Sequence, residues 1–339
     1  MVNPDKAARL HAESIIIDSL NISNWNAPEV FAGIHKGGVT ATNATIACWE
    51  NFEETVDTIA GWYLKFDKYA NIIMPIKSVA DIRKAKAEGK SGIIFGFQNS
   101  SPIEDDLRRL QVFHELGVLI IQITYNNSNF VGAGYTESPD YGLTRFGRDF
   151  VQECNRLGIL VDLSHVGDRT AMDAIKVSTK PVAFTHVGPR ALFKHYRNKT
   201  DEQLKALVAK GGVVGAVAEA NFMAAWKDVT LSDYLDIIDY LVNLIGIDHV
   251  GIGPDFTKSQ KTEWFRWLFT GRNTDAKVEY PKEFRKVGNI VPLIYPKGFQ
   301  TAAEFPKLTE ALLGRGYSDE DVKKIMGENF LRLFREVWS

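Results

Sequence analysis

Two histidines stand at matching positions after consecutive apolar segments of the sequence. His165 comes just past the apolar residues 159–163, and His186 directly follows residues 181–185, twenty-one positions later. If both segments are neighbouring parallel strands, their ends lie ~4.8 Å apart. At that spacing two imidazoles can share one ion at Zn–N distances of ~2.1 Å. The pair therefore predicts a metal site, although a single histidine in such a place is more often structural.

Polar residues also end six further apolar segments, and three of them extend the predicted site. Asp255 is placed to act as a general base beside a metal-activated water or as an additional ligand. Its alternative role is to cap a helix or bridge a loop. Glu219 could be a ligand or a base. Gln98 is a weak candidate ligand, because its amide lacks the charge that hard and borderline ions favour.

Two further regions could contact a substrate. Tyr125 and Asn126 begin an amide-rich loop after an apolar segment, and asparagines either form turns or line a polar pocket. Arg197 follows His186 by eleven residues. Its planar guanidinium suits bidentate capture of a carboxylate, so it could anchor an acidic substrate. The alternative for Arg197 is an ordinary surface arginine.

The sequence around these positions alternates between strand-like and helix-like patterns. Apolar runs predict strands at residues 14–20, 44–48, 92–97, 118–124, 159–163, 181–185, 212–218 and 249–254. Helical spacing, caps and terminal glycines predict helices at residues 53–69, 78–88, 103–117, 145–158, 168–178, 200–211 and 231–246. This alternation predicts a parallel sheet in one (β/α)8 TIM barrel domain over residues 1–339, whose chemistry sits at the carboxyl ends of the strands.

Residues 256–305 interrupt the pattern with many aromatic residues and prolines. Connections of this length are uncommon in compact domains and tend to be lids or subunit contacts. We expect a lid here, the alternative being a surface excursion packed on its own aromatic residues. Exposed aromatic side chains between Trp264 and Phe269 suggest a homodimer. Residues 306–339 are predicted to close the barrel with two helices, the second beginning at Ser318.

Composition excludes several classes of protein. The 339 residues are 45% hydrophobic and 24% charged, as in a globular protein with a full core. A net charge of −2 does not favour nucleic acid or a membrane surface as a partner, which leaves a small-molecule substrate. Cys48 and Cys154 are too few for a disulfide framework, and neither a signal peptide nor a membrane span is predicted. We therefore expect a cytoplasmic protein.

Several ordered motifs resemble one known family. They lie at residues 141–147, 155–165, 197–198, 253–256 and 327–332. Through them the chain resembles the membrane (renal) dipeptidase family, which are zinc hydrolases of the amidohydrolase type on a (β/α)8 barrel. The resemblance implies that His165 and His186 bind the second zinc ion of the family. It also implies that Arg197 holds the terminal carboxylate of the substrate and that Asp255 acts as a proton shuttle.

The first half of the family's site does not carry over. The family has Asp-Gly-His-Asn-Asp after the first strand, and this chain has Asp18-Ser19-Leu20-Asn21-Ile22, so aliphatic residues replace both ligands of the first zinc. Gln98 stands for the bridging glutamate. Tyr125 stands for the histidine that polarises the substrate carbonyl, and it could donate a hydrogen bond to an oxyanion instead. The resemblance therefore implies at most one zinc ion.

Three functions remain compatible with these residues. The first is a dipeptidase-like, metal-dependent hydrolase acting on a dipeptide or a small carboxylate-bearing amide. The second is a non-hydrolytic lyase or isomerase that uses the same pocket for acid–base chemistry, and the third is a metal-free pseudoenzyme. In the first, the residues have these roles: His165 and His186 as zinc ligands, Gln98 and Glu219 as weak further ligands, Asp255 and Tyr125 as catalytic residues, and Arg197 and Asn126 as substrate-binding residues.

Overall fold

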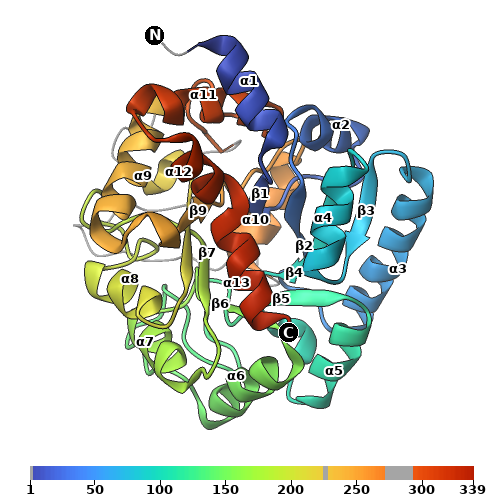
Figure 1. The fold of residues 1–339 in the computed structure, drawn as a ribbon. Helices are drawn as coiled ribbons and strands as arrows, with labels where there is room; N and C mark the ends of the chain where they lie inside the picture. Colours follow the sequence, from blue (N-terminus) through green and yellow to red (C-terminus); the bar gives the residue numbers. More distant parts are fainter. Residues whose placement is uncertain (1–2, 224–227, 272–292) are drawn as a thin grey trace.

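A barrel of parallel strands surrounded by helices forms the framework of the protein (Figure 1). The computed structural model describes residues 3–223, 228–271 and 293–339. Eight strands follow one another around the sheet in the order β1-β2-β4-β5-β6-β7-β8-β9, and β3 pairs with β4 outside this path. Every pairing between these strands is parallel. The predicted (β/α)8 TIM barrel is confirmed.

Each of the eight predicted strand segments overlaps one strand of the barrel. The extra strand β3 was missed, because it is only four residues long and contains Pro75. The strands are β1 (Ile17–Asn21), β2 (Ala41–Ala47), β3 (Ile73–Ile76), β4 (Ser91–Phe97), β5 (Val118–Gln122), β6 (Leu160–Asp162), β7 (Ala183–Val187), β8 (Val213–Ala216) and β9 (Val250–Ile252).

The helices begin close to the predicted caps, with one exception. The helix expected from residue 103 begins only at Arg108, because residues 101–103 form a 3-10 turn and Glu104 has a φ of 52°. The helices are α1 (Pro4–Glu13), α2 (Pro28–Lys36), α3 (Phe52–Lys68), α4 (Val79–Ala87), α5 (Arg108–Glu115), α6 (Arg145–Leu157), α7 (Asp168–Val177), α8 (Asp201–Val208), α9 (Leu231–Ile245), α10 (Thr262–Thr270), α11 (Phe305–Arg315), α12 (Asp319–Lys323) and α13 (Asn329–Val337).

The C-terminal helix α13 closes the amino end of the barrel. Its apolar side chains form one buried cluster with residues near the starts of the strands, among them Ile17, Ala41 and Val213. Phe330 and Phe334 of α13 belong to this cluster. Ser318 caps α12 with a capping box, as the sequence predicts. With this end plugged, a site for a ligand has to lie at the carboxyl ends of the strands.

The segment after β9 contains a helix that the sequence did not predict. The aromatic residues expected to be exposed between Trp264 and Phe269 lie on α10, and that expectation is wrong. Phe265 and Leu268 are buried, and Trp264 is half-buried. They pack against the mouth of the barrel, since a one-sided apolar helix is stabilised by burying that side. The homodimer was expected because these aromatic residues were predicted to be exposed, so their burial removes the support for it. Residues 272–292 of the predicted lid lie outside the described residues.

No helix in the described part of the chain has the length and apolar character needed to cross a bilayer.

Close packing inside the barrel gives a first test of stability. A side chain on Gly253 would collide with the carbonyl oxygen of Thr185 and come within 2.7 Å of the Ser19 hydroxyl. We expect Gly253→Ala to lower the free energy of unfolding by about 1–3 kcal/mol through overpacking. Gly33→Ala, on α2 with nothing within 4 Å of the new methyl group, is the control and should raise it by about 0.5–1 kcal/mol. Urea unfolding followed by circular dichroism measures both, and equal effects would contradict the packing.

Candidate active site

The two predicted histidines meet at the carboxyl end of the barrel. His165 follows β6 and His186 lies in β7, and their Nε2 atoms are 3.0 Å apart. Asp255 follows β9, with one carboxylate oxygen 4.0 Å from Nε2 of His186. All three side chains are buried. The tertiary structure thus brings together the three residues that the sequence placed at separate strand ends.

The Nδ1 atom of each imidazole is held by an oxygen that accepts a hydrogen bond. Nδ1 of His165 donates to the side-chain oxygen of Asn126 at 2.7 Å. The hydroxyl of Thr185 donates to Asp162 at 2.5 Å, so it accepts the hydrogen bond from Nδ1 of His186 at 2.8 Å. In the neutral form, therefore, both Nε2 atoms carry lone pairs that face each other. A cation between them, either a proton or a metal ion, satisfies this arrangement.

Burial sets the charges of these groups. It lowers the pKa of His165 and of His186 well below 6.5, and the Arg197 guanidinium lowers both pKa values further. Burial also raises the pKa of Asp255 to about 7, against the opposing effect of Arg197. The two histidines are therefore neutral, which is the form that binds metal. A carboxyl group with a pKa near 7 suits a general base at neutral pH.

Tyr125 covers one face of the histidine pair. Its ring stacks on that of His165, with centroids 4.2 Å apart and an angle of 26° between the planes. Burial, helped by the charge of Asp255, raises the pKa of Tyr125 well above 10. Tyr125 therefore keeps its proton at neutral pH, and its role as a hydrogen-bond donor to substrate stays a prediction.

The space beside the pair is a small cavity. Its volume is ≈20 Å³, which is room for about one water molecule. Glu219, predicted from its strand end, lines it and accepts a hydrogen bond from Asn221 at 2.6 Å. Six lining residues from loops and from α10 were not predicted, because the sequence shows no periodic signal there. They are Tyr135, Phe222, Thr257, Leu268, Phe269 and Leu293.

Arg197 and Gln98 bind other groups of the protein instead of pointing to the substrate or the metal ion predicted for them. Arg197 is buried and donates to the main-chain oxygens of Ser164 at 2.7 Å and His186 at 2.8 Å. It therefore ties together the strand ends that carry the histidines. Its Nε atom has no hydrogen-bond partner in the described part of the chain. Gln98 donates to Thr45 at 3.0 Å and is not among the residues that line the small cavity.

Two residues of the site adopt a left-handed backbone conformation. Asn126 and Asp255 both have a φ of 61°. Asparagine and aspartate tolerate this region better than most residues, but it still costs free energy. The peptide N–H of Asp255 donates to Leu20, and its carbonyl oxygen accepts from the hydroxyl of Tyr295 at 2.6 Å. Neighbouring elements thus hold the strained backbone in place.

The two histidines offer a metal ion two neutral nitrogen ligands, and no charged side chain in the described part of the chain is grouped with them as a third ligand. Among residues 3–223, 228–271 and 293–339, no three side chains of His, Cys, Asp or Glu are grouped closely enough to hold a metal ion. Catalytic zinc sites usually have three protein ligands. Two nitrogens 3.0 Å apart nevertheless fit a shared ion at Zn–N distances of ~2.1 Å. Solvent, substrate or the nearby carboxylate of Asp255, 4.0 Å from Nε2 of His186, would complete the shell of such an ion.

Comparison with known families shows to which family the chain belongs. The family model described as membrane dipeptidase, peptidase family M19, matches residues 5–264 and 293–339. The chain belongs to the membrane dipeptidase family. The resemblance identified in the sequence is confirmed.

Individual relatives agree with this membership. Dipeptidase tcpJ of Claviceps purpurea is 30% identical over 76% of this chain, and the chain spans about half of that curated relative, 53% of its length. A crystal structure of an amidohydrolase from Pseudomonas aeruginosa is 43% identical with a TM-score of 0.92, covering 98% of this chain and 99% of that one. A Rhodobacter sphaeroides metallopeptidase liganded with a phosphinate mimic of L-Ala-D-Ala shares the fold, with 22% identity, a TM-score of 0.78 and coverage of 96% and 100%.

An apolar cluster fills the other half of the barrel mouth in this membrane dipeptidase family member. Ile22 and Tyr125 stand where the family resemblance implies a zinc ligand and a carbonyl-polarising histidine. They pack with Cys48 and Leu268 in one buried cluster. Burial raises the pKa of Cys48 well above 9, so its thiol stays protonated. The mouth thus has a polar half at β6, β7 and β9 and an apolar half near β1 and β2.

A buried lysine behind the site allows a test by pH. Lys199 donates to Val166 at 2.7 Å, and burial lowers its pKa to about 7 from 10.5. Between these values the unfolded chain binds more protons than the folded one, so this residue makes the free energy of unfolding rise with pH. From pH 7 to 9 we expect that rise to be about 2 kcal/mol larger in the wild type than in Lys199→Met. Chemical unfolding at both pH values measures it, and parallel pH curves would contradict the assignment.

Proposed function

We propose that this chain is a dipeptidase-like hydrolase that acts on a dipeptide or a small carboxylate-bearing amide and uses at most one metal ion. The observation that carries the proposal is the pair of neutral imidazoles, His165 and His186, with Nε2 atoms 3.0 Å apart and Asp255 beside them. Family membership supports hydrolysis of this class.

His165 and His186 are the residues that would hold the ion, which we propose to be zinc. The ion would supply Lewis acidity, the property that makes water a nucleophile at neutral pH. The apolar cluster of Ile22, Cys48, Tyr125 and Leu268 occupies the place where the family resemblance implies the first zinc ion, which argues against a second ion there. Gln98 and Glu219 stay weak candidates as further ligands, and Glu219 has the stronger support because it lines the cavity.

The residues of the chain then have distinct roles. Asp255 accepts the proton of the attacking water, for which its buried position and raised pKa suit it. Tyr125 donates from its hydroxyl to the oxyanion that develops on the substrate carbonyl. Arg197, which is buried and is not among the residues that line the cavity, attracts the substrate carboxylate through its positive charge. Asn126 lines the cavity where a substrate would bind and orients His165.

Substrate binding requires the cover of the cavity to move. A space of ≈20 Å³ does not hold a dipeptide, and Leu268, Phe269 and Leu293 line it. We propose that the segment 256–305, which contains α10, acts as a lid. We also propose that the whole chain forms one domain. A cytoplasmic location belongs to the same proposal, and the free state of Cys48 and Cys154 supports it. The homodimer stays a prediction.

Zinc binding tests the metal part of the proposal. We expect the wild type to bind one equivalent of zinc at most, because only two neutral nitrogens are arranged to share an ion. His165→Ala should abolish this binding. Asn126→Gly removes the oxygen that orients His165 while tolerating a positive φ, and it should weaken the affinity by about 10–100-fold. Competition with a chromophoric chelator measures each affinity. His35→Ala, at an exposed position on α2, is the control, and unchanged binding in His165→Ala would refute the site.

Activity tests the catalytic roles. Against a panel of dipeptides, we expect Asp255→Asn to lower kcat by about 10²–10⁴-fold, because the water loses its general base. Tyr125→Phe should lower kcat by about 10²–10³-fold through loss of one oxyanion donor. Asp248→Asn, at an exposed ion pair with Lys324, is the control. Stopped-flow or end-point amino acid analysis measures turnover, and an active Asp255→Asn variant would contradict the assignment.

A lyase or isomerase is the second candidate function. Asp255 as base and Tyr125 as protonated acid both line the cavity and could act as an acid–base pair on one substrate. Chemistry by this acid–base pair does not require a metal site with three protein ligands. Turnover in ¹⁸O-labelled water separates the two functions, because hydrolysis incorporates the solvent oxygen and isomerisation does not. A ligand that raises the unfolding temperature, without turnover and regardless of chelator, would indicate a pseudoenzyme instead.

A further inference from the structure

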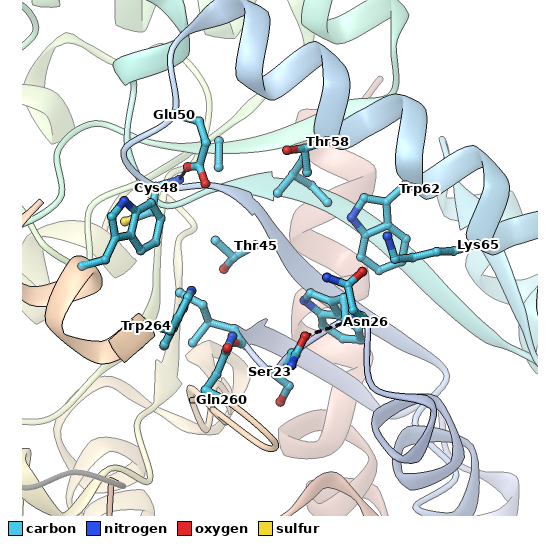
Figure 2. A pocket seen from close by; sticks show the side chains of 16 residues that line it. Ser23, Asn26, Thr45, Cys48, Glu50, Thr58, Trp62, Lys65, Gln260 and Trp264 are labelled. Atoms are coloured by element: carbon cyan, nitrogen blue, oxygen red, sulfur yellow. Dashed lines mark hydrogen bonds between the residues drawn. The ribbon is translucent and has the colours of Figure 1, made fainter. Parts of the chain in front are cut away.

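A second cavity lies at the same end of the barrel, on the far side of the apolar cluster (Figure 2). Its volume is ≈240 Å³. The residues after β1, the end of β2, one face of α3 and the first turns of α10 enclose it. Ile22 lines both cavities and packs with Cys48 and Tyr125 between them. The second cavity is therefore separate from the histidine pair.

Tryptophans form much of its wall. Four of the seven tryptophans of the chain line this cavity. Trp25 and Trp62 form one pair, with ring centroids 5.4 Å apart, and Trp264 and Trp267 form another at 6.2 Å. The first pair comes from the β1–α2 loop and α3, and the second from α10. Indole surfaces at both ends favour a ligand with a flat apolar body, because aromatic faces stack on such groups.

One hydrogen-bond donor at the Trp62 end lacks an acceptor. The ammonium group of Lys65 is half-buried, 5.5 Å from the centroid of the Trp62 ring, and has no ion pair or hydrogen bond in the described part of the chain. Burial lowers its pKa below 10.5. Unpartnered donors in partly desolvated positions are unfavourable until an acceptor binds, so this end of the cavity is complementary to an anion.

A further donor lies on the floor of the cavity. The hydroxyl of Thr45 accepts from the Gln98 amide at 3.0 Å, which leaves its own hydrogen free to donate. Thr45 is the one half-buried residue of β2, and Figure 2 shows it between the two ends of the cavity. It can donate to a polar group in the middle of a ligand.

The negative charge of Glu50, at the end of the cavity opposite Lys65, limits a ligand to one negative group. Glu50 lies across the cavity from Lys65 (Figure 2). One of its carboxylate oxygens accepts from the peptide N–H groups of Cys48 and Trp49, at 2.7 and 3.0 Å. A second anionic group would be repelled there. The volume is also below the roughly 300–1,000 Å³ of pockets that hold drug-sized ligands.

We propose that this cavity is a second ligand site, which binds a small aromatic monocarboxylate with its carboxylate at Lys65 and its ring between the indoles. The site does not depend on the proposed hydrolase activity.

Isothermal titration with indole-3-acetate on the full chain tests the site. We expect binding to the wild type, at least tenfold weaker binding to Lys65→Met, and a several-fold loss in Thr45→Val. Tryptamine has the same ring with a cationic end, and we expect no binding of it. Lys68→Met, on the exposed side of the same helix, and His165→Ala, in the other cavity, should bind as the wild type does.

Three results would overturn the proposal. They are no binding of indole-3-acetate to the wild type, equal binding to Lys65→Met, and loss of binding in His165→Ala, which would place the ligand at the histidine pair. Lys65→Arg keeps the positive charge and should retain binding within a few-fold. It separates loss of the charge from misfolding, and thermal unfolding of each variant verifies that the chain is folded.

Discussion

The carboxylate of Asp162, buried at the end of β6, fixes the geometry of the whole polar half of the barrel mouth. One of its oxygens accepts from the N–H and hydroxyl of Ser164 and from the N–H of Thr185, and the other accepts from the Thr185 hydroxyl. These bonds hold the ends of β6 and β7 in register. They also commit the Thr185 hydroxyl proton to Asp162, so that His186 must donate through Nδ1 and present Nε2. A carboxylate with fewer donors would be costly at this depth.

The two halves of the barrel mouth are stabilised by different interactions. In the polar half, charge and hydrogen bonds are balanced within a small space, and Arg197 adds two bonds to the main chain beside the histidines. In the other half, Ile22, Tyr125 and Cys48 are stabilised by excluding water. The apolar half also divides the mouth into two cavities. Where the family resemblance implies polar groups, this chain has Ile22 and Tyr125, and they form part of the wall between the two cavities.

The barrel concentrates strain and charge at one end because its other end is sealed. The apolar face of α13 plugs the amino ends of the strands and contributes stability without chemistry. At the carboxyl end the chain supports left-handed backbone at Asn126 and Asp255 and neutral buried imidazoles at His165 and His186. The left-handed conformations cost free energy, whereas burial itself favours the neutral form of the imidazoles. They persist because the surrounding strands and loops determine them from several sides at once.

The sequence by itself determined the barrel, seven of the helices between its strands, the helical C-terminal segment from residue 306, and the strand ends that carry His165, His186 and Asp255. Those features depend on local periodicity, caps and strand ends, which are readable along the chain. It did not predict α10, the bond from Asn126 to His165 or the buried position of Arg197. Nor did it predict the cavity beside Lys65, whose walls come from four separate segments. Only the tertiary structure decided these, because side chains distant in sequence meet through packing, and packing depends on volumes and directions that no local pattern records.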